Sequence, residues 1–340
     1  MVKKEILEAA PDNQLIRNTM QKADLLLDSY KNPVCSVSGG SDSDIMLDLL
    51  EKVRNGRPIH YVFFDTGIEY AATKRHLDEL DKKYGIKIER RNASVPVPLG
   101  CKRYGYPFLS KDVSQKIEML QRHNFQWEDE PYEVLVQKYK KCTSALKWWC
   151  NQKNPKYDIQ SYRGLKEFLI KNPPDFMISD HCCRGAKKDP AKKYYKEIDC
   201  CLKIIGERRA EGGVRSSKHQ SCFDPIAKGE IPSYRPLWFW TDEDKQQYKE
   251  HYGMKYSDCY EVYGLKRTGC AGCPFNSQFD DALALIHQFE PRLEVAVTNI
   301  FGKSYDYTHK YREFKAELAG KRKRKKEIDS EKSELSADSN

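Results

Sequence analysis

Six consecutive small and polar residues have the composition of a phosphate-binding turn. Ser38-Gly39-Gly40-Ser41-Asp42-Ser43 follows a short apolar run and precedes apolar residues at helical spacing. Small residues let the backbone approach an anion, and a helix N-terminus offers it unpaired N–H groups and the positive end of the helix dipole. The spacing matches neither the Walker A pattern nor the dinucleotide-binding glycine pattern. A serine-rich helix cap without a ligand is the alternative.

Two pairs of cysteines have spacings that suit a metal. The chain contains twelve cysteines, among them the adjacent Cys182 and Cys183 and the Cys-x-x-Cys pair Cys270 and Cys273. No signal-peptide core precedes residue 20 and no apolar run would span a bilayer, so we expect a cytoplasmic protein without membrane contact. Thiols stay reduced there, which favours metal binding over disulfides.

Alternating strand and helix patterns must position these residues. Residues 13–30 have helical spacing, residues 34–37 and 59–64 are apolar runs typical of buried strands, and residues 86–89 alternate like a short strand. Helical patterns separate the strands, which predicts an open, mostly parallel, doubly wound α/β sheet with helical insertions. The phosphate-binding turn then lies at the carboxyl edge of that sheet.

The composition indicates domain boundaries and the chemical class of the substrate or partner. We expect an N-terminal helical segment over residues 1–33, one α/β domain with the cysteines over residues 34–317, and a disordered charged tail over residues 318–340. The run KRKRKK in the tail reads first as a solvated segment and second as a nucleic-acid contact. The net charge of +9 favours an anionic substrate or partner without choosing among nucleotides, nucleic acids and acidic proteins.

The turn and the segment after the second strand resemble a known family. Residues 38–43 match SGGxDS, the pyrophosphate-binding PP-loop of the ATP pyrophosphatases, and residues 65–73 resemble the DTGxxFPET segment of the phosphoadenosine phosphosulfate (PAPS) reductase family. The resemblance implies that Asp65, Thr66 and Gly67 lie beside the nucleotide. Ala71 and Ala72 replace the proline and glutamate of that segment.

The cysteine segments resemble those of the cluster-binding adenylyl-sulfate reductases. Residues 182–190 are similar to CCxxRKxxP and residues 269–273 to GCxxC, which implies that Cys182, Cys183, Cys270 and Cys273 bind one [4Fe–4S] cluster with Lys187 close by. Ala186 stands where the family has an arginine. A structural zinc site is the alternative, and Cys142, in a similar Cys-x4-Lys segment, is an alternative ligand.

A third segment supplies candidate phosphate ligands. Residues 204–215 resemble the family's strand followed by GxRxxES and a later arginine, so the resemblance implies nucleotide contacts for Gly206, Arg208 and Arg215, with Gly212 replacing the serine. An arginine can bind phosphate with two parallel hydrogen bonds. Residues 234–252 resemble the PLxxWTxxDVWxY module, in which Thr241 would cap a helix that begins with Asp242.

The resemblance implies an adenylating enzyme that takes part in sulfur transfer. An intact PP-loop predicts binding of ATP with Mg²⁺ and release of pyrophosphate, with Ser38, Asp42, Ser43 and Lys187 as candidate catalytic residues and residues 38–43 as nucleotide ligands. These features are closest to the adenylating subunit of DNA phosphorothioation systems and to cluster-dependent tRNA thiolases. The partners implied are a sulfur donor such as a cysteine desulfurase, and DNA or tRNA.

Two alternatives remain at this point. A sulfonucleotide reductase would bind PAPS or adenylyl sulfate and form sulfite, but no cysteine follows Cys273 to match that family's nucleophile on the C-terminal tail. A non-catalytic nucleotide-binding module with structural zinc would bind ATP without releasing pyrophosphate. Oligomeric state does not follow from the sequence.

Overall fold

Two compact units make up the structure, and each is described by itself. The computed structural model describes residues 2–212, 219–225 and 230–337, with side chains described up to residue 320. The first unit comprises Met1–Val97, Cys183–Gly272 and Asp280–Ala296, and the second comprises Pro98–Cys182, Cys273–Phe279 and Val297–Asn340. The division expected from the sequence, into residues 1–33, 34–317 and 318–340, stays a prediction.

A six-stranded sheet forms the centre of the first unit, in the order β3-β2-β1-β4-β6-β5. All neighbouring strands are parallel except β5 and β6. The strands are β1 (Pro33–Ser36), β2 (His60–Asp65), β3 (Ile88–Asn92), β4 (Leu202–Ile205), β5 (Phe223–Asp224) and β6 (Ser233–Tyr234). The chain runs outward from β1 to β3 in one direction and from β4 in the other, so the strand order reverses between β1 and β4. Open α/β sheets bind ligands at such a switch point.

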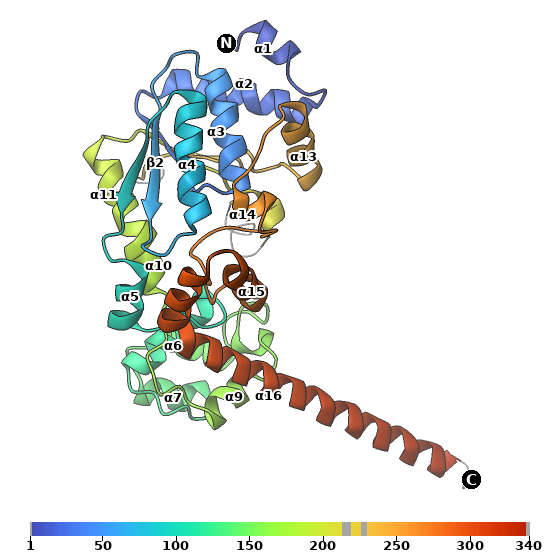
Figure 1. Cartoon of the computed structure of the whole chain (residues 1–340). Coiled ribbons are helices and arrows are strands. Elements are labelled where there is room, and N and C mark those ends of the chain that lie inside the picture. Colours follow the sequence, from blue (N-terminus) through green and yellow to red (C-terminus); the bar gives the residue numbers. More distant parts are fainter. Residues whose placement is uncertain (1, 213–218, 226–229, 338–340) are drawn as a thin grey trace. The chain divides into compact units, whose positions relative to one another are not determined.

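Helices cover both faces of this sheet, which confirms the predicted doubly wound α/β class. The helices of the first unit are α1 (Lys4–Glu8), α2 (Gln14–Ser29), α3 (Ser41–Val53), α4 (Ala71–Tyr84), the π-helix η2 (Arg184–Lys188), α11 (Asp189–Glu197), the 3-10 helix η3 (Arg209–Glu211), α13 (Asp242–His251) and α14 (Asp258–Glu261). Figure 1 shows β2 with α4 on one side and α11 on the other.

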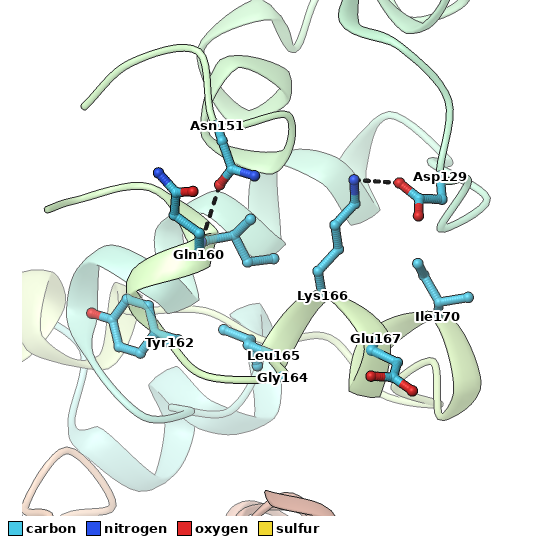
Figure 2. A pocket seen from close by; sticks show the side chains of 10 residues that line it. Asp129, Asn151, Gln160, Tyr162, Gly164, Leu165, Lys166, Glu167 and Ile170 are labelled. Carbon is cyan, nitrogen blue, oxygen red and sulfur yellow. Dashed lines mark hydrogen bonds and ion pairs between the residues drawn. The ribbon is translucent and has the colours of Figure 1, made fainter. Parts of the chain in front are cut away.

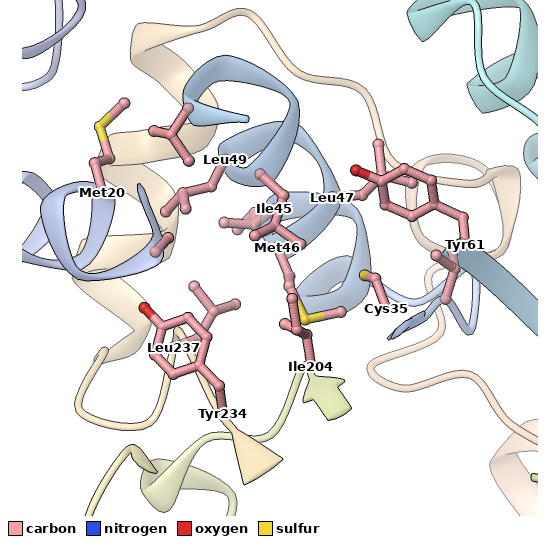
Figure 3. Packing of buried hydrophobic residues seen from close by; sticks show 14 of the residues in the cluster. Met20, Cys35, Ile45, Met46, Leu47, Leu49, Tyr61, Ile204, Tyr234 and Leu237 are labelled. Atoms are coloured by element: carbon pink, nitrogen blue, oxygen red, sulfur yellow. The ribbon is translucent and has the colours of Figure 1, made fainter. Parts of the chain in front are cut away.

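Alternation along the strands explains why both faces are covered. Cys35 and Tyr61 point into the larger core with α2 and α3, whereas Val34 and Val62 pack against Tyr194 of α11. Figure 3 shows the larger core, in which Met46 of α3 extends toward Cys35 of β1 and Ile204 of β4. A parallel strand buried on both faces reads as a continuous apolar run, which is how β1 and β2 were recognised in the sequence.

The second unit is helical and its core is aromatic. Its elements are α6 (Lys111–Arg122), α7 (Tyr132–Lys138), α8 (Thr143–Trp149), the 3-10 helix η1 (Ile159–Ser161) and α9 (Leu165–Lys171). Helices α5 (Val97–Tyr104), α10 (His181–Cys183), α15 (Phe279–Phe289) and α16 (Pro291–Ala337) each span a boundary between the units. Trp148, Trp149, Phe108 and Phe168 are fully buried in the core.

Helix α16 (Pro291–Ala337) is the last element of the described chain. Among the described residues, no helix is both long enough and apolar enough to cross a membrane.

Candidate functional site

The PP-loop, residues 38–43, connects β1 to α3 at the switch point of the sheet. Gly39 has a φ of +67°, a left-handed conformation that glycine adopts without strain, and Gly40 is the N-cap of α3. The N–H groups in the first turn of a helix have no partner within the helix. The loop therefore directs backbone donors and the positive end of α3 toward the carboxyl edge of the sheet, as the sequence predicted.

The two outer serines of the loop have structural contacts. Ser43 is buried, and its hydroxyl donates to the Gly40 carbonyl oxygen at 2.8 Å and accepts from the backbone N–H groups of Ser38 and Gly40 at 3.2 Å. The Ser38 hydroxyl lies 3.2 Å from that of Ser43. In this conformation Ser43 holds the loop together, whereas the sequence suggested a direct phosphate contact.

Two cations converge on Asp42, at the first turn of α3. Arg208 Nε donates to Asp42 Oδ1 at 3.1 Å, and the Lys245 ammonium forms an ion pair with the same oxygen while donating to Ser41 Oγ at 2.9 Å. Burial alone would raise the pKa of Asp42, but the charges of Lys245 and Arg208 lower it below its ordinary value. The N-terminus of α3 is thus flanked by two fixed positive charges.

The segment after β4 approaches the loop closely at a glycine. A Cβ on Gly206 would lie 3.2 Å from the Ser43 backbone nitrogen and 3.3 Å from the Asp42 carbonyl carbon. Arg208 also donates to Asp242 at 2.8 Å, at the start of α13. Gly206 and Arg208 therefore lie at the PP-loop, as the family pattern implied, whereas Arg215 is outside the described residues.

Helix α13 carries a residue that the sequence analysis missed. Thr241 caps α13 as expected, since its hydroxyl accepts from the Asp244 N–H at 3.2 Å and Asp244 accepts from the Thr241 N–H at 2.8 Å. This cap fixes the first turn of α13, in which Lys245 reaches the PP-loop. The available signal was the position of Lys245 four residues after the predicted cap.

Cys270 lies beside the end of β2. Its Sγ lies 3.5 Å from Thr66 Oγ1, which donates to Glu69 Oε1 at 2.6 Å. The Ala271 N–H donates to the Ile68 carbonyl oxygen at 2.9 Å and fixes this approach. Asp65 and Gly67 lie next to it, with the Gly67 N–H donating to Asp65 Oδ1 at 2.8 Å. The segments recognised separately at residues 65–73 and 269–273 thus meet in one place.

Lys187 is close enough to this group to act on its electrostatics. Burial raises the pKa of the Cys270 thiol and of the Glu69 carboxyl, and the charge of Lys187 opposes the rise in both. The charge of Cys183 also acts on Cys270. Cys183, Cys270 and Lys187 belong to the first unit, while Cys182 and Cys273 belong to the second unit.

Cys142 occupies a different environment from the other candidate ligands. It is fully buried in the aromatic core of the second unit, where its Sγ donates to the Tyr139 carbonyl oxygen at 3.4 Å. Burial raises the pKa of this thiol. A neutral thiol in an apolar core is a poor metal ligand, because metals bind the thiolate.

A carboxylate distant in the sequence caps α4. Glu290, also in the first unit, accepts from the backbone N–H groups of Ala71 at 2.9 Å and of Ala72 at 3.3 Å, at the start of α4. It also accepts from the Tyr263 hydroxyl at 3.1 Å. Since Tyr70 provides no side-chain cap, Glu290 supplies the negative charge that a helix N-terminus favours.

The second unit contains a cavity and a polar cluster. The cavity has a volume of about 420 Å³, and the residues that line it include Asn151, Gln160 and Lys166. Figure 2 shows that Asn151 accepts a hydrogen bond from the Gln160 backbone and that Lys166 forms an ion pair with Asp129. The cluster of Glu118, Asp180 and His181 brings ligand atoms within 4.8 Å of one another. Arg122 forms an ion pair with Glu118 at 2.7 Å, so the charge of the Glu118 carboxylate is balanced without a metal ion.

Comparison with known families identifies the family of the chain. The model of the phosphoadenosine phosphosulfate reductase domain matches residues 32–147 and 117–276, which together cover more than half of the chain. The chain belongs to this family. The PAPS reductase domain places the protein in the PP-loop superfamily, in agreement with the loop between β1 and α3.

Curated relatives of this PAPS reductase domain protein carry no described activity. The uncharacterised protein MJ0066 of Methanocaldococcus jannaschii is 24% identical over 260 residues, covering 76% of this chain and 38% of the relative. An uncharacterised 37.8 kDa protein of Escherichia phage 186 is 25% identical over 242 residues, covering 71% of this chain and 66% of the relative. The chain spans less than two thirds of the length of each.

Solved structures with similar folds include two members of the superfamily. A PAPS reductase from Candida auris, in complex with phosphate, has a TM-score of 0.42 and 13% identity, over 79% of this chain and 96% of that chain. The U34-tRNA thiolase NcsA from Methanococcus maripaludis, with its [4Fe–4S] cluster, has a TM-score of 0.34 and 17% identity, over 87% of this chain and 79% of that chain. Similarity at this level does not transfer a function.

Proposed function

We propose that this protein binds ATP at the PP-loop, adenylates a substrate with release of pyrophosphate, and takes part in iron–sulfur-dependent sulfur transfer. The observation that carries the proposal is the convergence of Arg208 and Lys245 on the first turn of α3. Two cations and the helix N-terminus form a site for a polyphosphate, because both favour negative charge.

The proposed first step is attack by a substrate oxygen on the α-phosphorus of ATP. The new bond joins that oxygen to the α-phosphorus, the bond to the bridging oxygen breaks, and pyrophosphate leaves with the electron pair. Arg208 and Lys245 would stabilise the charge that develops on pyrophosphate, and the backbone of Gly39 and Gly40 would position the phosphates. Asp42 offers the carboxylate oxygen that Mg²⁺ prefers, and Mg²⁺ would neutralise phosphate charge.

The cysteines would supply the second part of the function. Thiolates are the ligands of iron–sulfur clusters, and Cys183 and Cys270 already act on each other electrostatically. With Cys182 and Cys273 they would complete the four ligands, and Lys187 would offset their negative charge. Structural zinc, which also binds four thiolates, is the competing occupant.

The final acceptor is proposed from chemistry alone. In the sulfur-transfer scheme, the terminal sulfur of a persulfide from a donor such as a cysteine desulfurase attacks the activated acceptor and displaces its oxygen as AMP. A second thiol then reduces the resulting disulfide, becomes part of a new disulfide, and releases the thiolated acceptor. A nucleic acid, either DNA or tRNA, agrees with the net charge of +9. The activity, substrate and partners of the whole protein all belong to this proposal.

Metal content tests the cluster. We would purify the protein anaerobically and measure iron, acid-labile sulfide and zinc in the wild type and in Cys270→Ser, with Cys201→Ser as the control for a partly buried cysteine elsewhere in the first unit. We expect about four irons with matching sulfide in the wild type and the control, and loss of both in Cys270→Ser. One zinc without sulfide would contradict the cluster.

Calorimetric titration tests the nucleotide. We expect Mg²⁺–ATP to bind the wild type more tightly than PAPS or adenylyl sulfate, and Lys245→Ala to weaken ATP binding by about tenfold or more, since one charge-assisted contact to phosphate contributes about 1.5–3 kcal/mol. Preference for PAPS, with sulfite formed from it, would favour the sulfonucleotide reductase. ATP binding without pyrophosphate release from any tested acceptor would favour a non-catalytic module.

A further inference from the structure

A lysine-rich surface covers part of the second unit, away from the residues assigned to the nucleotide. Residues 134–157 contain no aspartate or glutamate, and their six lysines are Lys138, Lys140, Lys141, Lys147, Lys153 and Lys156. All six are exposed. Only Lys138 has a carboxylate partner within 4.0 Å among the described residues, namely Glu128. We call residues 134–157 the basic segment.

The packing of α8 determines which part of the basic segment faces outward. Ala145, Leu146, Trp148 and Trp149 are fully buried in the aromatic core. Ser144 and Lys147, three residues apart, are exposed and lie on the same side of a helix with this period. Because the apolar face of α8 packs into the core, its opposite face places Ser144 and Lys147 together at the surface.

A buried lysine lies beneath this surface. Lys116 of α6 is only 7% exposed, and its ammonium donates to Ser144 Oγ at 3.2 Å. Among the described residues it has no carboxylate within 4.0 Å. Burial lowers the pKa of Lys116, the positive charge of Lys153 lowers it further, and Asp112 opposes these effects. Lys116, Lys153 and Ser144 thus form a group whose positive charge is not balanced by an ion pair.

We infer that Lys116, Ser144, Lys147 and Lys153 bind a backbone phosphate of a nucleic acid, and that the basic segment is a docking surface for that polymer. An ammonium buried without a counter-ion is costly, and a phosphate oxygen would supply both the missing charge and an acceptor for Ser144. One phosphate accounts for this group, whereas the further lysines require neighbouring phosphates along a chain.

The surroundings favour a nucleic acid over an acidic protein. Tyr157, at the end of the basic segment, is 38% exposed, and an exposed aromatic ring can stack on a base. Asn151, within the segment, lines the cavity of Figure 2 together with Gln160, and such amides hydrogen-bond to base edges. An acidic peptide would use the lysines but neither of these features.

Fluorescence anisotropy with labelled oligonucleotides tests the inference. The probes are a single-stranded RNA and a single-stranded DNA of the same mixed sequence, each about 20 nucleotides long to span several phosphate contacts, without ATP. We would compare the wild type with Lys147→Glu/Lys153→Glu. The charge-matched control is Lys82→Glu/Lys87→Glu, at exposed lysines of the first unit.

We expect the Lys147/Lys153 variant to bind at least about tenfold more weakly. The slope of the logarithm of its binding constant against the logarithm of the salt concentration should be smaller by about one to two, the loss of about one to two phosphate contacts. The control should lose much less affinity. The inference is wrong if the wild type binds neither probe, or if both double variants lose the same affinity. Because no ATP is present, the result is independent of the reaction proposed at the PP-loop.

Ser144→Asp separates binding from folding. A carboxylate at this position would pair with Lys116, so thermal stability should rise while oligonucleotide affinity falls. A purely structural role for Lys116 predicts the same rise in stability with unchanged affinity, and that result would overturn the inference.

Discussion

At the level of single residues, Gly39 is the PP-loop position where the backbone and the packing both exclude a side chain. Its φ is +67°, and a Cβ would lie 2.8 Å from Thr73 Cγ2 of α4. Gly56, between α3 and β2, has a similar φ of +79° but no atom within 4 Å of a Cβ. Alanine at Gly56 would carry only the cost of the left-handed backbone, whereas alanine at Gly39 would carry that cost and the collision with Thr73.

Gly39→Ala should remove nucleotide binding at a moderate cost in stability. A non-glycine residue in the left-handed region costs about 1–3 kcal/mol, so we expect both Gly39→Ala and the control Gly56→Ala to lower the free energy of unfolding in urea. Only Gly39→Ala should weaken ATP binding, by about tenfold or more, because relief of the collision with Thr73 displaces the loop. Equal ATP affinity in the two variants would show that the loop backbone does not position the phosphates.

At the level of elements, a buried pair joins α3 to α4. His76 Nε2 lies 2.7 Å from Asp44 Oδ2, and both side chains are buried. Burial alone would lower the pKa of His76, but its hydrogen bond with Asp44 and the charge of that carboxylate raise it above the ordinary value. The folded protein therefore holds the His76 proton more tightly than the unfolded chain does.

This pair predicts a loss of stability at alkaline pH. The stabilisation is complete below the unfolded pKa of about 6.5 and is lost as the pH rises through the higher folded pKa. We expect the free energy of unfolding in urea to fall between about pH 6 and pH 9, and His76→Gln to flatten this dependence. Burial raises the pKa of the Asp44 carboxyl, and the protonation of this carboxyl affects the free energy of unfolding at lower pH.

His60→Gln, at the start of β2, is the control and should keep the pH dependence of the wild type. Parallel curves for the wild type and His76→Gln would show that another group is responsible for the change.

At the level of the whole molecule, the two units have separate cores. The larger core of the first unit surrounds α3 and the sheet, and the aromatic core of the second unit surrounds α8 and α9. The PP-loop, Arg208 and Lys245 all belong to the first unit. A ligand that binds one unit stabilises that unit by mass action and leaves local opening elsewhere unchanged.

ATP should therefore slow hydrogen exchange in one unit only. At an ATP concentration about 100 times the Kd, the stabilisation is about 2.7 kcal/mol. We expect mass spectrometry to show slower exchange in residues 34–53 and 242–251 and no change in residues 143–171. Equal slowing in both regions would mean that the two units open together.

The sequence by itself determined the order of helices and strands from α2 to β3 and the position of the PP-loop. These features are local: the apolar runs at β1 and β2, the small residues at 38–43 and the cap at Thr241 each act over a few neighbouring residues. The family motifs also located Gly206 and Arg208 at the loop. The aromatic core of the second unit was not foreseen, because its helices lack a distinctive pattern.

Only the tertiary structure decided which distant residues complete the site. Lys245 pairs with Asp42 across more than 200 residues of chain, and Glu290 caps α4 across 219 residues of chain from Ala71. Ser43 turned inward because its hydroxyl satisfies the buried loop backbone. Such contacts depend on how the helices pack against the sheet. The place of Lys245 after the predicted cap was a local signal, but it did not reveal Asp42 as the partner.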